Sequence, residues 1–271
     1  MSAFVTSCDG TRIAYDSQGS GPVVILVAGA MQFRAFDPAT SAMAALLAAE
    51  GFTVVNFDRR GRGDSARAPS FTLADTIEDL RALIEVAGGP VALVGNSSGG
   101  SISLAAAAAG LDVSAMVLFE VPLREELGGD GAEFLAGLRE NIAHGTPAGT
   151  IEYFMKDMPP EWLEGARNSP GWPIMTAMGP SLEADAESLG WTQSAPRAEL
   201  FSTIGARTLV LVGEQTLPIM PPAAESIAGN LAHATLGRLP AENHGWEPAV
   251  MAHKVAAFLK EALAPRSTDR P

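Results

Sequence analysis

One ten-residue stretch, Val91–Gly100, restricts the fold of this chain more than any other. A short apolar run ends abruptly at Gly95, and an Ala-rich segment typical of a helix follows from Ser101 to Ala109. The pattern Gly95-x-Ser97-x-Gly99 therefore predicts a strand, a very tight turn and a helix, with Ser97 at the apex. Glycines are needed there because the helix and the strand pass too close for a Cβ atom. Such a turn exposes the serine hydroxyl and points the first N–H groups of the helix toward it.

Strand and helix patterns alternate around this turn. Asp9-Gly10 indicates a hairpin between strands at 3–8 and 12–17. Continuous apolar runs, typical of strands buried on both faces, occur at 23–28, 52–57, 91–94, 115–120 and 208–213, with a weaker strand at 234–239. Helical patterns end at Glu50 and cover 72–87, 101–109, 222–229 and 248–263. Strands that alternate with helices predict a mostly parallel sheet with helices on both faces.

The middle of the chain has a different character. Residues 122–203 are rich in Pro, Trp, Met and Phe, predict helices and contain no convincing strand. We interpret them as a helical cap inserted into an α/β core made of residues 1–121 and 204–265, with a disordered tail at 266–271. An insertion at this position lies over the crevice where parallel sheets bind ligands. Most of its aromatic side chains are expected to form the core of the cap itself.

The composition excludes several classes of function. The formal net charge of −13 disfavours nucleic acid and anionic membrane surfaces as partners. The single cysteine, Cys8, excludes an intrachain disulfide and fits a reducing compartment, and no signal peptide is recognised, so we expect a cytoplasmic protein. No metal-ligand cluster, phosphate-binding loop or dinucleotide glycine pattern is present, so we expect neither metal nor cofactor. The sequence leaves open whether the protein forms a homodimer.

Four features in this order resemble the α/β-hydrolase family over nearly the whole chain. They are Gly29 after the first apolar run, the turn Asp58-x-Arg60-Gly61-x-Gly63-x-Ser65, the Gly95–Gly100 turn, and the late Asn243-His244-Gly245. The resemblance implies an α/β fold, a mostly parallel sheet flanked by helices with a helical cap, and the chemistry of a serine hydrolase. Asp58 and Arg60 are interpreted as a structural turn network rather than as catalytic groups.

Ser97 is the candidate nucleophile, and a serine needs a base to take its proton. Of the four histidines, His244 follows a predicted strand, in a loop closed by Gly245, at the sheet edge where Ser97 is expected. The family has its general base at this position, so the resemblance implies that role for His244. The other three histidines are interpreted as solvated or structural.

The acid departs from the commonest pattern of the family. Family members usually carry an Asp shortly after the strand predicted at 208–213, where this chain has Thr216. Glu120 ends a buried strand, where a carboxylate is unfavourable unless it is used, and Glu214 lies near the usual position. Some branches, including haloalkane dehalogenases and zearalenone lactonases, have the acid at the Glu120 position. Those lactonases also carry a Ser after the nucleophile, as Ser98 does here. We favour Glu120 and keep Glu214 as the alternative.

Backbone amides are expected to form the oxyanion hole. One is that of Ser98, and the second comes from the loop after the first apolar run, either Ala30 or Met31. The choice is open because the family usually has His-Gly where this chain has Ala28-Gly29. Candidate substrate contacts are Phe33, Phe134, Phe154, Met158, Trp172 and Trp246.

The sequence thus predicts a cofactor-free serine hydrolase that cleaves an ester or lactone of a hydrophobic small molecule through an acyl-enzyme. Two alternatives remain open, because the usual His before Gly29 and the usual Asp at Thr216 are missing. The chain could be a non-catalytic ligand-binding protein on the same scaffold. It could also be a non-hydrolytic enzyme, such as a perhydrolase or a lyase.

Overall fold

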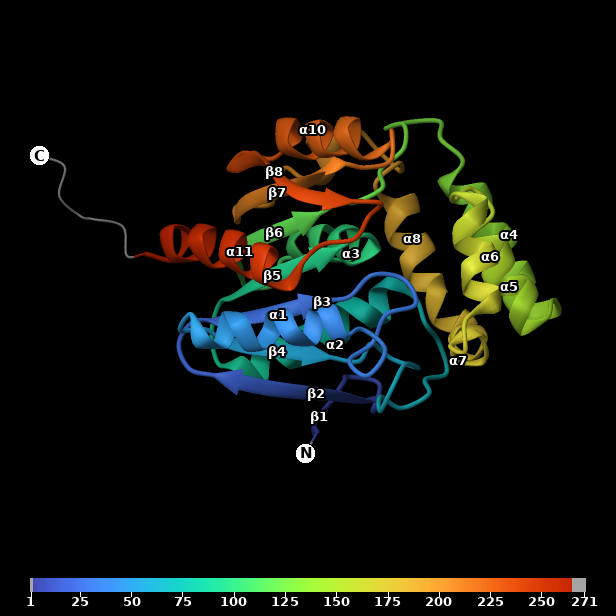
Figure 1. Cartoon of the computed structure of the whole chain (residues 1–271), viewed down its shortest axis with the longest axis horizontal. Helices are drawn as coiled ribbons and strands as arrows, with labels where there is room; N and C mark the ends of the chain where they lie inside the picture. The colour runs from blue at the N-terminus through green and yellow to red at the C-terminus, as the bar shows by residue number, and fades with distance from the viewer. Residues whose placement is uncertain (1, 265–271) are drawn as a thin grey trace, which may run out of the picture.

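An eight-stranded sheet in the order β1-β2-β4-β3-β5-β6-β7-β8 forms the centre of the computed structural model, which describes residues 2–264 (Figure 1). Its strands are β1 (Ala3–Thr6), β2 (Arg12–Gly19), β3 (Val23–Val27), β4 (Thr53–Phe57), β5 (Val91–Asn96), β6 (Val113–Phe119), β7 (Arg207–Gln215) and β8 (Ala234–Glu242). Strand β2 pairs antiparallel with β1 and β4, and every pair from β4 to β8 is parallel. The predicted mostly parallel α/β sheet is confirmed.

Helices cover both faces of the sheet, because successive side chains of each buried strand point to opposite faces. On one face, Ile25, Leu93 and Met116 pack against α2 (Leu73–Ala87), α3 (Ser98–Ala108) and α10 (Met220–Asn230). On the other face, Leu26 and Val94 pack against α1 (Pro38–Ala49) and α11 (Pro248–Ala262). Helix α2 begins at the predicted capping box, in which Thr72 and Asp75 bond each other's backbone amides.

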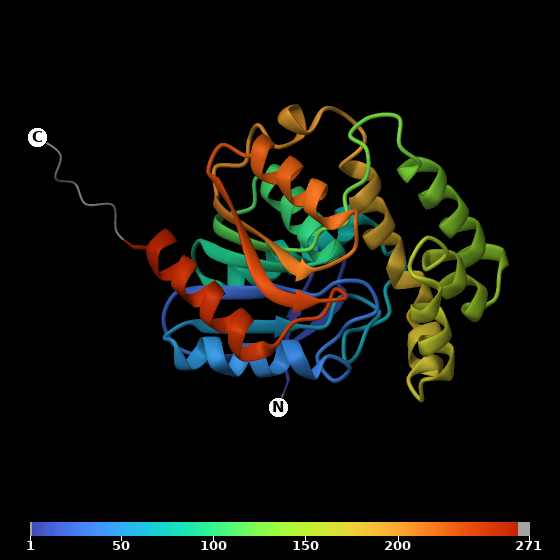
Figure 2. The same cartoon turned by 45° about the horizontal axis from the view of Figure 1, so that its top comes forward.

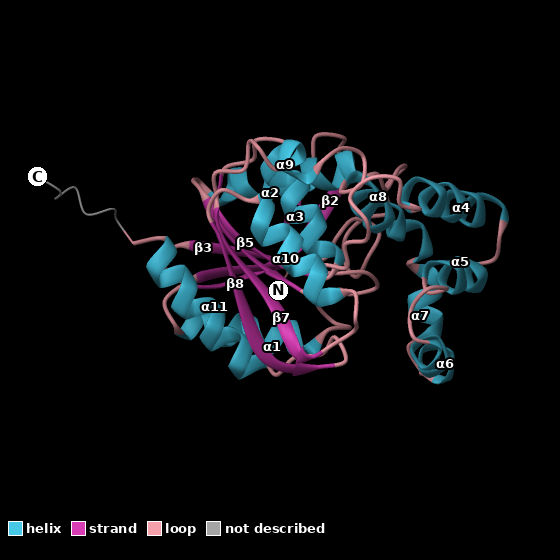
Figure 3. Cartoon of the chain, turned by 90° about the horizontal axis from the view of Figure 1, so that it is seen from above, coloured by secondary structure: helices cyan, strands magenta, loops and turns pink. Residues whose placement is uncertain are grey.

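The segment between β6 and β7, called the cap below, consists of helices and loops and contains no strand among its residues, all of which are described. Its elements are α4 (Gly131–His144), α5 (Pro147–Phe154), α6 (Pro160–Asn168), α7 (Trp172–Ala177), the 3-10 helix η1 (Gly179–Leu182), α8 (Glu183–Trp191) and α9 (Arg197–Leu200). Helices α4 to α7 stand away from the sheet, and α8 lies between them and the core, as Figures 1 and 3 both show. The predicted tail at 266–271 lies outside the described residues.

The carboxyl ends of β3, β5 and β6 all point toward this cap, and the turned view of Figure 2 shows helix α8 lying beside them. Leu138, Ile151 and Leu182 form a separate apolar core within the cap. Among residues 2–264, no helix is both long enough and apolar enough to cross a lipid bilayer.

The predicted turn at Ser97 depends on glycines that leave room for a backbone. A Cβ atom on Gly99 would lie 2.1 Å from the carbonyl oxygen of Val27, and one on Gly95 would lie 2.6 Å from the Cα atom of Gly100. Helix α3 therefore begins at Ser98, three residues earlier than predicted, and presses directly against the end of β3. This contact fixes where the first turn of the helix lies.

We expect Gly99→Ala to lower the free energy of unfolding by about 1–3 kcal/mol, because the added methyl group meets backbone that cannot move aside. Denaturant unfolding measures the change. Gly165→Ala in α6 is the matched control: its Cβ would meet open space, so it should raise stability by about 0.5–1 kcal/mol. A Gly99→Ala protein as stable as the wild type would contradict the close contact.

Candidate active site

Ser97 lies at the apex of the turn between β5 and α3 in an unfavourable backbone conformation. Its φ of 55° and ψ of −128° are rarely adopted by a residue with a side chain. The side chain of Ser97 does not cap α3, although Ser97 occupies the N-cap position. Its hydroxyl is instead directed to a cavity that Ser97 lines. The strain, about 1–3 kcal/mol, is held by the glycine contacts and by the bond from the Ser97 amide to the carbonyl of Phe119.

Positive φ angles at residues other than glycine are concentrated around this turn. Within residues 2–264, the non-glycine residues with positive φ are Met31, Ser97, Glu120, Asn243 and His244. They come from four separate segments of the chain, and Met31, Ser97 and His244 line one cavity. Strained backbone of this kind is typical of functional sites.

His244 and Glu120 are in direct contact. The Nδ1 atom of His244 lies 2.6 Å from Oε2 of Glu120, and the other carboxylate oxygen accepts a bond of 2.9 Å from the amide of Gly213. Glu120 is only 2% exposed. The carboxylate directly after β6 thus reaches the loop after β8, across the intervening strand β7.

Burial of the Glu120 carboxyl raises its pKa, but hydrogen bonds with His244 and the Gly213 amide, together with the nearby Thr216 hydroxyl, lower it by more. The net result is a pKa below the ordinary value of 4.5. Glu120 is therefore a carboxylate at neutral pH and can only accept hydrogen bonds. The Nδ1 atom of His244 must then carry the proton in this contact, which leaves Nε2 as an acceptor in the neutral ring.

The side chain of Glu214, the alternative acid, is exposed and makes no hydrogen bond or ion pair with any described residue. Thr216, which stands where the family usually has Asp, has its hydroxyl oxygen buried. Of the two candidate acids, only Glu120 contacts the ring of His244.

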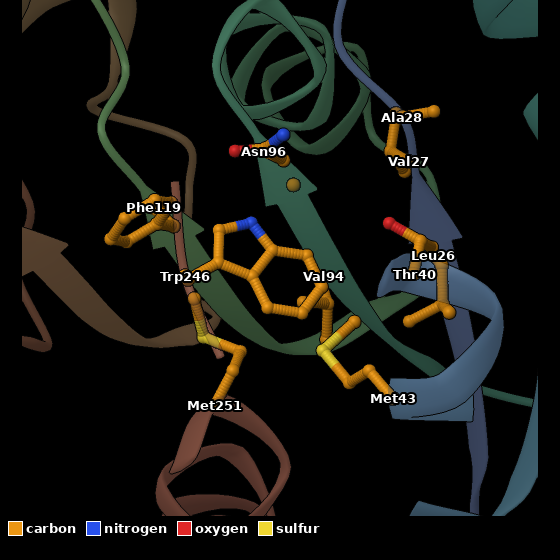
Figure 4. Close-up of a pocket in the computed structure, with 11 residues that line it drawn as sticks. Leu26, Val27, Ala28, Thr40, Met43, Val94, Asn96, Phe119, Trp246 and Met251 are labelled. Carbon is orange, nitrogen blue, oxygen red and sulfur yellow. The ribbon is translucent and has the colours of Figure 1, made fainter. Parts of the chain in front are cut away.

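The loop of His244 is anchored by its neighbours. Asn243 donates its amide to the carbonyl of Gln215, and Gly245 donates to Glu242. The ring of Trp246 packs among Met43, Met251, Val94 and Asn96 around a small void of about 20 Å³, as Figure 4 shows. Trp246 also lines the larger cavity at Ser97, so it separates the site from the core beneath.

That larger cavity has a volume of about 470 Å³ and lies between the sheet edge and the cap. Ser97 and His244 line it together with four of the predicted substrate contacts, Phe134, Phe154, Met158 and Trp246. The other two do not line it: Phe33 stacks on Phe36, and Trp172 packs against the apolar core of the cap. The wall includes the half-exposed ion pairs of Arg124 with Asp130 and Asp157, so this part of the cavity borders solvent.

Trp162 of α6 is a contact that the sequence analysis did not single out. The centroid of its ring lies 6.1 Å from the centroid of the His244 ring, and the two ring planes are inclined by 30°. Trp162 is one of the aromatic residues of the insertion, so a sequence signal was present. The spacing of residues in this short helix does not predict, however, which face of the helix turns toward the site. The cap therefore touches the candidate base as well as covering the cavity.

The three amides proposed for the oxyanion hole make no hydrogen bond with the described residues, although Ser98 itself does not line the cavity. Within residues 2–264, the amides of Ala30, Met31 and Ser98 donate no backbone or side-chain hydrogen bond. Ala30 and Met31 both line the cavity, so the choice between them stays open.

Gln32 supports the loop that carries Ala30 and Met31, in which the usual histidine is missing. Its side-chain oxygen accepts bonds from the Gly29 amide at 2.8 Å and from Nδ2 of Asn96 at 3.1 Å. Its side-chain nitrogen donates to Asp37. Gln32 therefore ties this loop to the residue before Ser97, a role for which a single glutamine in a loop gives no sequence signal.

The turn at 58–65 is a network of ion pairs. Arg60 donates two bonds, of 2.8 and 2.7 Å, to Asp79 of α2, and Asp58 pairs with Arg34. Neither Asp58 nor Arg60 lines the cavity. These contacts agree with the structural interpretation of that turn.

Comparison with known proteins identifies the fold. Residues 24–258 match the model of the alpha/beta hydrolase family. The solved structure of an alpha/beta hydrolase from Sphaerobacter thermophilus is 33% identical and has a TM-score of 0.83, covering 95% of this chain and 100% of the other. A comparison with curated proteins gave no significant match.

More distant solved structures share the fold. A thermophilic esterase from Thermogutta terrifontis is 22% identical with a TM-score of 0.69, over 97% of this chain and 98% of the other. An enol-lactonase from Burkholderia xenovorans is 19% identical with a TM-score of 0.67, over 97% and 100%.

The lowered pKa of Glu120 predicts a pH-dependent contribution to stability. A carboxyl whose pKa is lower in the folded than in the unfolded chain stabilises the fold fully above the unfolded value of about 4.5, and this contribution is lost as pH falls through the folded value. The difference in free energy of unfolding between wild type and Glu120→Gln should therefore shrink as the pH falls below 4.5. Urea unfolding across this range measures it.

Glu214→Gln is the matched control, since that side chain is exposed and without a partner among the described residues. Its difference from the wild type should stay flat over the same pH range. A flat difference for Glu120→Gln as well would contradict the assignment of Glu120 as a carboxylate stabilised by its hydrogen bonds.

Proposed function

Because this chain belongs to the alpha/beta hydrolase family, we propose that it is a serine hydrolase that cleaves an ester or a lactone of an apolar small molecule. The observation that carries the proposal is the 2.6 Å contact of His244 with the buried Glu120, beside a cavity that His244 shares with Ser97. Nucleophile, acid and base follow in the order Ser97, Glu120, His244 along the chain, which is the order typical of this fold.

The positions of the protons on Glu120, His244 and Ser97 support these roles. The Glu120 carboxylate accepts a hydrogen bond from the Nδ1–H group of His244 and holds the ring in one tautomer. The Nε2 atom is then free to take the proton of the Ser97 hydroxyl as its oxygen attacks the substrate carbonyl. The resulting imidazolium is stabilised by the adjacent carboxylate, and it returns its proton to the leaving alcohol. Water activated by the same base hydrolyses the acyl-enzyme and restores Ser97.

The free amides support stabilisation of the tetrahedral intermediate. We assign the oxyanion hole to the amides of Ser98 and Ala30, with Met31 as the alternative to Ala30. The amide of Ser98 also begins α3, so the helix dipole favours negative charge at this position. Donors held rigidly in this way are often the largest single contribution to acyl-transfer catalysis.

The lining of the cavity supports an apolar substrate. Aromatic and methionine side chains of the cap, including Phe134, Phe154 and Met158, face Ser97 across a volume of about 470 Å³. Such a cavity suits a small organic molecule whose reactive carbonyl lies at Ser97. The distant structural likeness to an esterase and to an enol-lactonase is consistent with either an open-chain or a cyclic ester.

A panel of aryl esters and lactones tests the proposal. We expect Ser97→Ala to lose kcat by about 10⁴-fold or more, and Glu120→Ala by about 10²- to 10⁴-fold, because the histidine loses its orienting carboxylate. Glu214→Gln, the control carboxylate, should stay within about twofold of the wild type, since it touches neither residue. Steady-state kinetics and labelling of Ser97 by a fluorophosphonate give the readouts.

The competing functions predict other outcomes on the same panel. A ligand-binding protein would bind panel members without turnover, and Ser97 would not be labelled. A perhydrolase or lyase would show turnover dependent on Ser97 without ester cleavage. Full activity of Glu120→Ala together with loss of activity in Glu214→Gln would reverse the assignment of the acid.

A further inference from the structure

A buried cluster of charges connects the cap to the core beside Ser97. Asp185 of α8 is completely buried, and its Oδ1 atom accepts bonds of 2.6 Å from Nη1 of Arg59 and from the hydroxyl of Ser98. Its Oδ2 atom accepts a bond of 2.6 Å from Nη2 of Arg62. All four side chains are at most 2% exposed.

The proposed oxyanion hole has two arms: the amide of Ser98, and the loop at 28–32 that carries the amides of Ala30 and Met31. The two arginines hold this loop. Arg62 donates to the carbonyl oxygen of Gly29 at 2.7 Å and to that of Gln32 at 3.3 Å. Arg59 makes a longer bond of 3.5 Å to the carbonyl of Ala28. The carbonyls of residues 28, 29 and 32 flank the two candidate donors at 30 and 31, so the arginines fix the loop on both sides of them.

The hydroxyl of Ser98 reaches the same aspartate from the other arm. Ser98 follows the nucleophile directly, and its amide is the second proposed donor. Asp185 therefore bonds the Ser98 arm directly, through the Ser98 hydroxyl. It is linked to the loop at 28–32 indirectly, through Arg59 and Arg62. No other described carboxylate forms an ion pair with either of these arginines.

We propose that Asp185, a residue of the cap, is a positioning residue that sets the distance between the two arms of the oxyanion hole. The proposal rests on the serine hydrolase function proposed above. It assigns the cap a second role besides lining the cavity: α8 is part of the catalytic framework. Asp185 touches neither the cavity nor any reacting atom, so it acts only through the groups that it holds.

The charge balance explains why a single aspartate has this influence. Two guanidinium groups face one carboxylate, and both are buried. Burial and the neighbouring Arg59 lower the pKa of Arg62 to about 10, although Asp185 opposes this. Burial raises the pKa of Asp185, and attraction to Arg59 and Arg62 lowers it by more, so the group is a carboxylate. Without it, the two arginines would repel each other and draw the loop at 28–32 with them.

Three substitutions separate positioning from simple attachment of the cap. Asp185→Asn removes the charge but keeps an acceptor for Ser98, and Ser98→Ala keeps the amide of residue 98 but removes its hydroxyl bond to Asp185, while leaving the ion pairs intact. Ser188→Ala is the matched control: in the same α8–α3 interface its hydroxyl bonds the Ser101 hydroxyl at 2.7 Å and the main-chain carbonyl of Asp185 at 2.9 Å, but it bonds neither the Asp185 carboxylate nor the proposed donor amides. Thermal unfolding checks that each variant is folded, and fluorophosphonate titration gives the active fraction.

We expect Ser98→Ala to lower kcat by about 10-fold and Asp185→Asn by about 100-fold, with KM within about twofold, since displaced donors weaken only transition-state binding. Affinity for a trifluoromethyl ketone, which places an oxyanion in the hole, should fall by the same factors. Ser188→Ala should retain the wild-type kcat. Equal losses in Ser98→Ala and Ser188→Ala, or losses confined to KM, would overturn the proposal.

Amide resonances measure the positioning without any turnover. In ¹⁵N-labelled protein, the Ala30 and Met31 amides should shift in Asp185→Asn and stay unchanged in Ser188→Ala. If they shift although the wild type cleaves no ester, the positioning holds and the hydrolase function fails. If they stay unchanged while ester cleavage is normal in the folded Asp185→Asn protein, the positioning fails and the hydrolase function holds.

Discussion

The contact between the first turn of α3 and the end of β3 is the constraint on which the site depends. Gly99 lies so close to the carbonyl of Val27 that no side chain fits between them. This contact brings the amide of Ser98 beside the loop that begins at Ala28, and it forces Ser97 into its strained conformation. The nucleophile and both candidate arms of the oxyanion hole are therefore consequences of one backbone approach.

The position of the acid follows from the space around β7. A Cβ atom on Gly213 would lie 2.8 Å from Oε1 of Glu120, so the carboxylate occupies the room that a side chain there would fill. The glycine amide then serves as a donor to the carboxylate. A glutamate directly after β6 is long enough to pass β7 and reach the loop of His244, which explains how Thr216 can stand where the family usually has aspartate.

The sequence predicted the elements whose signals are local. Apolar runs and turn residues gave the strands, and Gly95, Ser97 and Gly99 gave the turn, because each pattern lies within ten residues. The contact of His244 with Glu120 could be proposed but not distinguished from one with Glu214, since side-chain reach across a strand has no local signature. Two expected substrate contacts, Phe33 and Trp172, do not line the cavity. Phe33 stacks on Phe36 within the loop after β3, a contact without a sequence signal, and a helix as short as α7 does not reveal which face it turns to the cavity.

The cluster around Asp185 lay beyond sequence reasoning for a further reason. Arg62 and Asp185 are separated by 123 positions, and each looks like an ordinary surface charge in its own segment. A buried ion pair of this kind adds little net stability, because desolvation offsets most of the attraction. An apolar contact between α8 and α3 would hold the cap as firmly. It would not, however, fix the direction of the carbonyls at 28, 29 and 32, and that directional constraint is what the charges add.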